Sequence, residues 1–287
     1  MAQSLRIVVT GGSGRVGTRL LEVLIARGHQ PIDLDQNSPK DRVAPYVQMD
    51  LRERTSLEPI FDKADAVVHL GEIPDLQHDM QPDKQFSHNC AVGARVLQTA
   101  ADMKVRRFVY ASSCQVYGLW GPGFERVSPP ATLPMDESAP LQPQNSYALA
   151  KIAVESYAKL LATQKPDFSI AVVRFPWVWD NRDVQNAKAQ MPEMLHLREG
   201  MNTYLHLDDA ASALALALES DRQGFEVYHA VAEDVWSARP IRELLKDHFG
   251  EKTGLPSDWS DFRSPVDTDK IRQHFGWSPR FKVGDTR

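Results

Sequence analysis

The stretch LRIVVTGGSGRVGTRLLEVLIARGH, residues 5–29, decides the fold of this chain. It begins with a short apolar run rich in β-branched residues, which is typical of a strand buried on both faces of a sheet. A glycine-rich segment follows, and apolar residues then recur at helical spacing until Gly28 ends the helix. A strand, a glycine turn and a helix in this order predict the first unit of a parallel α/β sheet.

Three glycines, Gly11, Gly14 and Gly17, lie where the predicted strand passes into the predicted helix. Glycine permits a tight turn, a close approach of the backbone to a pyrophosphate, and close packing of a helix on a strand. The N–H groups at the start of the helix favour an anion. We therefore predict a dinucleotide site in this loop, with Arg15 and Val16 among its residues. The spacing is GxxGxxG, which differs from the GxGxxG of simple dehydrogenases.

Acidic residues end the second and third predicted strands. Asp35 is placed to accept hydrogen bonds from both hydroxyls of an adenosine ribose and to repel a 2′-phosphate, which favours NAD over NADP. Two alternatives stay open: Asp33 or Asp35 is only a turn residue, and Arg15 could pair with a 2′-phosphate. Asp50 is a candidate partner for the adenine amino group, or else the N-cap of the next helix.

Strand and helix patterns alternate through most of the chain, and the further predicted strands are PIDLD, YVQMD, AVVHL, RFVYAS, SIAVVRF and FEVYHAV. This alternation predicts an α/β fold, a Rossmann-type doubly wound parallel sheet with a small C-terminal substrate lobe. We expect residues 1–175, completed by 206–230, to form the dinucleotide-binding domain. We expect residues 176–205 and 231–287 to form the small lobe near the carboxyl ends of the strands.

The composition argues against several classes of function. The chain has 287 residues and a net charge of −5, which gives no electrostatic basis for binding nucleic acid or an anionic membrane. Its two cysteines, Cys90 and Cys114, form neither a CxxC pair nor a metal motif. We recognise no signal peptide and no membrane-spanning apolar run, and we expect a cytoplasmic protein.

Tyr147 and Lys151 lie one turn apart in a predicted helix, so both side chains point to one face. A phenol is a poor base near neutral pH because its unperturbed pKa is about 10. A neighbouring ammonium favours the phenolate and lowers that pKa toward the working range. Taken alone, the pair is also consistent with an exposed helix face. Ser113 strengthens the catalytic interpretation, because it ends a predicted buried strand where a hydroxyl can polarise a substrate oxygen.

With these residues in place, the chain resembles an extended short-chain dehydrogenase/reductase of the NAD-dependent epimerase/dehydratase family. The matching stretches occur in order along nearly the whole chain: TGGSGRVG, GHQPIDLD, MDL, VVHLG, YASSCQVYG, MDESAPLQPQNSYALAK, VVRFPWVW, YLHLDDAA and DTDKIRQHFGWSP. The resemblance implies that Ser113, Tyr147 and Lys151 are the catalytic set. It also implies an NAD site that includes Asp35, Asp50, Leu51, Leu70, Gly71, Asn89, Tyr147, Lys151 and Pro176 beside the glycine loop.

Departures from the family pattern narrow the expected activity. Family dehydratases carry an Asp–Glu pair where this chain has Cys114 and Gln115, which cannot supply that acid and base, so we do not expect dehydration. Nucleotide-sugar epimerases carry an Asn at the position of Trp177. The segment 174–206 is also shorter than the one with which those enzymes bind UDP. The resemblance therefore shifts toward the uronate dehydrogenase-like branch, and we expect a free or acidic sugar rather than a nucleotide sugar as substrate.

We thus expect an NAD-dependent oxidoreductase that transfers hydride between NAD and a carbohydrate-like hydroxyl, with an NAD-dependent sugar epimerase as the alternative. A regulatory NAD-binding protein is a third hypothesis, disfavoured because all three catalytic residues are present. The expected substrate contacts are Glu72, Ser113, Trp177 and Arg198. Arg198 is either a partner for a substrate carboxylate or a solvated surface arginine. We expect no metal, since Glu72, Asp75, His78 and Asp79 are irregularly spaced as ligands. Family members often form homodimers, which the resemblance extends to this chain.

Overall fold

The computed structural model describes residues 4–75, 80–121, 124, 128–250 and 254–286. Contacts divide the chain into two compact units. The first consists of Met1–Ser112, Leu149–Val173 and Ala211–Val227, and the second of Ser113–Ala148, Arg174–Ala210 and Tyr228–Arg287. The second unit thus includes residues 113–148, which the sequence analysis assigned to the dinucleotide-binding domain. The division into functional domains stays a prediction.

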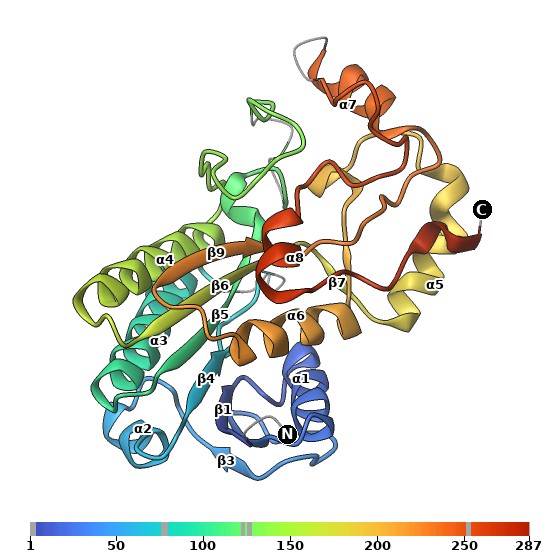
Figure 1. Ribbon diagram of the computed structural model, residues 1–287. Helices are drawn as coiled ribbons and strands as arrows, with labels where there is room; N and C mark the ends of the chain where they lie inside the picture. The colour runs from blue at the N-terminus through green and yellow to red at the C-terminus, as the bar shows by residue number, and fades with distance from the viewer. Residues whose placement is uncertain (1–3, 76–79, 122–123, 125–127, 251–253, 287) are drawn as a thin grey trace. The chain divides into compact units, whose positions relative to one another are not determined.

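The described residues form the strands and helices labelled in Figure 1. The strands are β1 (Arg6–Thr10), β2 (Gln30–Asp35), β3 (Tyr46–Gln48), β4 (Ala66–His69), β5 (Arg107–Ser113), β6 (Ser169–Phe175), β7 (Val178–Trp179), β8 (Leu205–His206) and β9 (Phe225–His229). The α-helices are α1 (Arg15–Ala26), α2 (Arg54–Phe61), α3 (Pro82–Asp102), α4 (Ser146–Gln164), α5 (Asn181–Gln190), α6 (Leu207–Glu219), α7 (Ile241–Phe249) and α8 (Asp269–Phe275). Short 3₁₀ helices are η1 (Cys114–Tyr117), η3 (Met191–Glu193), η4 (Glu199–Asn202) and η5 (Val283–Thr286).

The main sheet confirms the predicted fold class. Its strand order is β3-β2-β1-β4-β5-β6-β9, and β1 pairs in parallel with both β2 and β4. The chain therefore builds outward from β1 to β3 and then returns to place β4 on the other side of β1. The carboxyl ends of β1 and β4 mark the point where the strand order reverses, which is where sheets of this class bind ligands.

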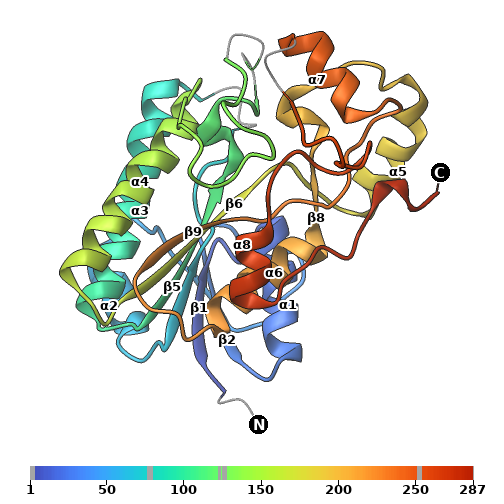
Figure 2. The same cartoon turned by 45° about the horizontal axis from the view of Figure 1, so that its top comes forward.

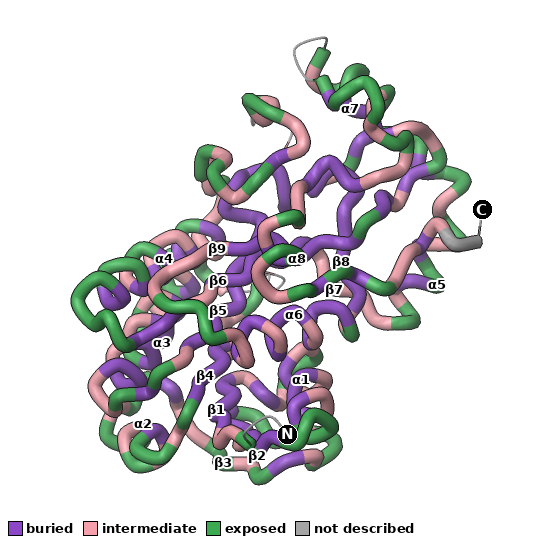
Figure 3. Tube along the Cα trace, viewed as in Figure 1, coloured by how far each residue is buried: buried purple, intermediate pink, exposed green. Residues whose placement is uncertain are grey.

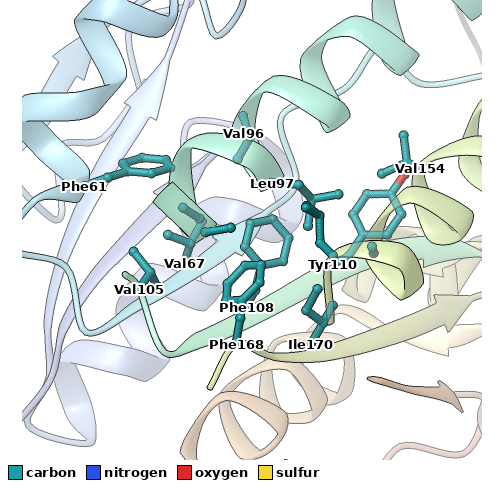
Figure 4. Close-up of a cluster of buried hydrophobic side chains, with 14 of the residues drawn as sticks. Phe61, Val67, Val96, Leu97, Val105, Phe108, Tyr110, Val154, Phe168 and Ile170 are labelled. Carbon is teal, nitrogen blue, oxygen red and sulfur yellow. The ribbon is translucent and has the colours of Figure 1, made fainter. Parts of the chain in front are cut away.

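A hydrophobic core fixes this sheet against its helices in the first unit. Apolar residues of α3 and α4, among them Val96, Leu97 and Val154, pack on the side chains of the central strands (Figure 4). The α3 and α4 ribbons lie side by side in Figures 1 and 2. The tube in Figure 3 shows β4 and β5 mostly buried, with Arg107 at the start of β5 partly exposed, as expected for parallel strands covered on both faces.

The second unit has a smaller core and a polar anchor. Val184, Tyr204, Ala232 and Val283 form a buried cluster. Asp209, in the first turn of α6, accepts hydrogen bonds at 3.0 Å from the N–H groups of two residues near the C-terminal end, Arg280 and Phe281. These bonds hold the C-terminal segment within the second unit. Among the described helices, none is long and apolar enough to cross a membrane.

Candidate functional site

The glycine loop after β1 has the close backbone packing that the sequence predicts. Gly11 has a φ of +73°, and a Cβ there would lie 2.7 Å from the backbone of Gly71 at the end of β4. A Cβ on Gly17 would lie 2.2 Å from the carbonyl oxygen of Gly11. Gly14 precedes α1 as its N-cap and provides no side-chain cap. The loop can therefore bring its backbone against a phosphate at the start of α1.

We expect Gly17→Ala to lower the free energy of unfolding by about 1–3 kcal/mol, because the added methyl group overlaps backbone atoms that cannot move independently. Urea unfolding measures this loss. Gly254→Ala is the matched control, since a Cβ at Gly254 meets no atom within 4 Å. Equal unfolding midpoints for the two variants would show that the loop has room to relax.

The two acids of β2 have different surroundings. Asp33 is buried under the loop, and the Ser13 hydroxyl donates to its Oδ2 at 2.9 Å. Burial raises the pKa of the Asp33 carboxyl, which the hydrogen bond from Ser13 offsets only in part. Asp35 ends the strand, and its Oδ1 accepts the N–H of Asn37 at 2.9 Å. Asp33 thus supports the loop, and the role of Asp35 toward a ribose stays a prediction.

Asp50 and Leu51 follow β3 in the first unit. Asp50 pairs with Arg52 at 2.5 Å, and hydrogen bonds from Arg52 lower the pKa of the Asp50 carboxyl to about 2. Asp50 is not the N-cap of α2, because that position belongs to Glu53. A methyl group of Leu51 lies 2.5 Å from where a Cβ on Gly71 would stand, so Leu51 covers this glycine.

Asn89 of α3 is fully buried and holds the segment after β4 through its backbone. Its side chain accepts the N–H of Ile73 and donates to the carbonyl of Ile73, both at 2.9 Å. This paired contact positions the chain just beyond Leu70 and Gly71. Asn89 therefore contributes to the predicted cofactor site by ordering backbone.

Lys151 of α4 lies in a buried polar cluster of the first unit. Its Nζ donates to the carbonyl oxygen of Ala111 at 2.7 Å and forms an ion pair with Glu72 at 3.0 Å. The side chains of Lys151 and Glu72 are 6% and 3% exposed. The sequence analysis proposed Glu72 as a substrate contact, and the structure places its carboxylate against Lys151. A role of Glu72 toward a substrate stays a prediction.

In the second unit, a hydrogen bond joins the turns that carry Ser113 and Tyr147. Ser113 caps η1, and its Oγ accepts the N–H of Gln115 at 3.2 Å. Asn145 accepts the N–H of Ala148 at 2.7 Å, at the start of α4, and donates to Gln115 Oε1 at 2.8 Å. The sequence analysis missed Asn145, although an asparagine just before a helical pattern is a recognised capping signal.

The other predicted residues of the second unit lie along the segment after β6. Pro176 is buried and Trp177 is partly buried, with the Trp177 carbonyl accepting the N–H of Leu205 at 2.9 Å. Arg198 is exposed, and its backbone N–H donates to Asn202 at 2.8 Å. The roles of Trp177 and Arg198 toward a substrate stay predictions.

Metal-binding residues do not cluster in the described part of the chain: there, no three His, Cys, Asp or Glu side chains are arranged to hold an ion. His78 and Asp79, which the sequence analysis considered, lie outside the described residues.

A family model described as the NAD dependent epimerase/dehydratase family matches residues 7–230. A curated relative, the UDP-glucose 4-epimerase of Corynebacterium glutamicum, is 24% identical, with 96% of this chain and 91% of that protein covered.

Solved structures share the fold over nearly their whole length. The UDP-glucose 4-epimerase of Thermotoga maritima, solved with UDP-glucose, has a TM-score of 0.71 at 21% identity, with 97% of this chain and 95% of that chain covered. The UDP-glucose 4-epimerase of Bifidobacterium longum, solved with NAD⁺ and UDP, has a TM-score of 0.73 at 17% identity, with 98% and 95% covered.

Proposed function

The chain belongs to the NAD-dependent epimerase/dehydratase family, and from this membership we propose that it is a sugar epimerase that retains its NAD through each turnover. NAD is the cofactor, as the family match and the solved relatives with bound NAD show. The first unit fits NAD, because a Cβ on Gly11 or Gly17 would collide with backbone atoms, so the tight packing of the loop before α1 requires glycine at both positions. The relatives favour epimerisation over the net oxidation expected from the sequence.

The observation that carries the hydride and proton transfer in this proposal is the pair Tyr147 and Lys151, one turn apart on α4, with the Lys151 ammonium held by the Ala111 carbonyl and Glu72. Bound NAD would accept a hydride from a sugar carbon and return it. Tyr147 would take the proton of the hydroxyl on that carbon and later give it back. Ser113 would donate a hydrogen bond to the same oxygen, and Lys151 would favour the phenolate.

Epimerisation requires that the hydride return to the opposite face of the ketone. No net oxidation then occurs, and NADH does not accumulate. Tyr147 acts in both the oxidation and the reduction of the sugar, since the proton that it removes in the first step is the one that it restores in the second.

The test is incubation of the protein and NAD with a panel of free sugars, uronates and nucleotide sugars, while NADH absorbance and the sugar's NMR spectrum are recorded. A new epimer with no accumulated NADH is the expected result. NADH formed in proportion to the sugar consumed would establish a dehydrogenase instead. The absence of both products across the panel would contradict the proposal.

A dehydrogenase of free or acidic sugars is the second candidate, and Trp177 is the observation that favours it. An indole lacks the paired donor and acceptor of the Asn that nucleotide-sugar epimerases carry there. Calorimetry with UDP in the presence of NAD separates the substrate classes. Because of Trp177 we expect no micromolar binding of UDP, and tight binding would assign a nucleotide sugar.

A further inference from the structure

Glu72 is a buried carboxylate that the proposed chemistry does not use. It follows β4 after Leu70 and Gly71, and the groups that contact it come from β4, β5 and α4 of the first unit. The Tyr110 hydroxyl of β5 donates to Glu72 Oε1 at 2.8 Å, and His69 Nε2 lies 3.5 Å from the same oxygen. Lys151 Nζ lies 3.0 Å from Oε2, in an ion pair between two buried side chains.

Further groups complete the electrostatic surroundings. His69 Nδ1 is 2.6 Å from the hydroxyl of Thr10 on β1. Cys90 and His88 of α3 lie within range of the Glu72 charge. Burial raises the pKa of the Cys90 thiol and Glu72 adds to that rise, whereas burial lowers the pKa of His88 and Glu72 opposes it. Lys151 is the group in ion-pair contact that carries a full positive charge.

Burial and the neighbouring charges have opposite effects on the ionisation of Glu72. Burial raises the pKa of its carboxyl, but the charge of Lys151 and the neighbouring His69 outweigh burial and lower the pKa to about 2. Glu72 is therefore a carboxylate throughout the pH range in which an enzyme of this kind is assayed, and its charge is constant there.

The net charge of Glu72, Lys151 and Tyr147 shows how Glu72 affects the ionisation of the Tyr147 phenol, which lies one helical turn from Lys151. With Glu72 ionised, the Lys151 ammonium is already compensated, so loss of the Tyr147 proton leaves a net charge of −1 on the three groups. If position 72 were neutral, the same proton loss would bring the group from +1 to zero. A low-dielectric surrounding favours the second change over the first.

We propose that Glu72 is a positioning residue that compensates the charge of Lys151 and thereby raises the pH at which Tyr147 becomes a base. The proposal rests on the proposed role of Tyr147 in proton transfer. In the proposed function Lys151 favours the Tyr147 phenolate, and here a buried carboxylate limits that effect. The enzyme's activity should accordingly reach its plateau at a higher pH than Lys151 alone would produce.

The first test is the pH dependence of kcat for Glu72→Gln, which retains the shape of the side chain and removes its charge. The low-pH limb is expected to move to lower pH by about one unit. Glu72→Asp restores the charge and should return the limb toward the parent's position. Tyr110→Phe removes a neutral hydrogen bond to the same carboxylate and should move the limb by only a few tenths of a unit. Superimposable limbs for Glu72→Gln and the parent would overturn the proposal.

The second test needs no cofactor and no substrate. Absorbance titration of tyrosinate, taken as the difference between each protein and its Tyr147→Phe counterpart, reports the ionisation of this one phenol. Glu72→Gln should shift that ionisation downward by a similar amount, and an unshifted curve would overturn the proposal. A parent that epimerises no sugar but shows this shift would contradict the proposed function and leave the inference about Glu72 supported.

Discussion

Replacement of Tyr147 by phenylalanine is expected to lower kcat by roughly 10²–10⁴-fold, the range that positioned proton transfer contributes. The variant keeps the ring and loses only the hydroxyl, so hydride transfer would have to proceed with no group to take the proton. NAD binding is expected to change by no more than a few-fold, because the glycine loop, Asp35 and Lys151 are untouched. Turnover and NAD titration on the same preparation separate the two effects.

Tyr157→Phe is the matched control for this experiment. Tyr157 lies on the same helix α4, and its hydroxyl donates to Gln98 of α3, within the first unit. Its loss should cost some stability and leave kcat within a few-fold of the parent. If Tyr147→Phe retained activity at the level of this control, Tyr147 would have no part in proton transfer.

Local patterns were sufficient to predict the strands that build the sheet. The run at residues 5–10 is apolar and β-branched, and it became β1 because parallel strands are covered on both faces. The order of the strands was not readable in the same way. That β4 joins β1 on the side away from β2 depends on pairing between residues far apart in the chain, which no local window contains.

The candidate site shows a similar division. The glycine spacing identified backbone positions that need the absence of a Cβ, and the structure gives a steric reason for Gly11 and Gly17. The partners of buried acids could not be read in advance. Asp33 supports the loop through Ser13, and Glu72 pairs with Lys151, because folding brings together strand ends and a helix. Whether a carboxylate is buried depends on these distant partners, and the residues next to it in the sequence do not reveal it.

The catalytic residues alone also do not determine whether the reaction is an oxidation or an epimerisation. Ser113, Tyr147 and Lys151 would serve both reactions, which differ in whether the hydride returns to the opposite face of the ketone or leaves the enzyme as NADH. Trp177 favours a compact substrate, whereas the relative that matches along nearly the full chain is a UDP-glucose 4-epimerase.

Removal of the Asp35 carboxylate is expected to weaken NAD binding on the order of 10²-fold, because each hydrogen bond from a ribose hydroxyl to a charged acceptor contributes about 1.5–3 kcal/mol. Asp35 ends β2 beside the glycine loop, is 9% exposed, and uses one oxygen for the N–H of Asn37. A carboxylate can accept further donors beyond that one. The parent should bind NAD more tightly than NADP, whose 2′-phosphate would meet this charge.

Asp35→Ala should therefore change the two cofactors differently: NAD loses two hydrogen bonds, whereas NADP loses a repulsion. The ratio of the NADP Kd to the NAD Kd is expected to fall on the order of 10²-fold, and calorimetric titration of both cofactors measures it. Asp41→Ala is the matched control, since it removes the same charge from an exposed position after β2. If the ratio fell equally in both variants, general electrostatics would explain the preference. If it fell in neither, Asp35 would not face the ribose, and Arg15 in the loop would become the residue to examine for a 2′-phosphate.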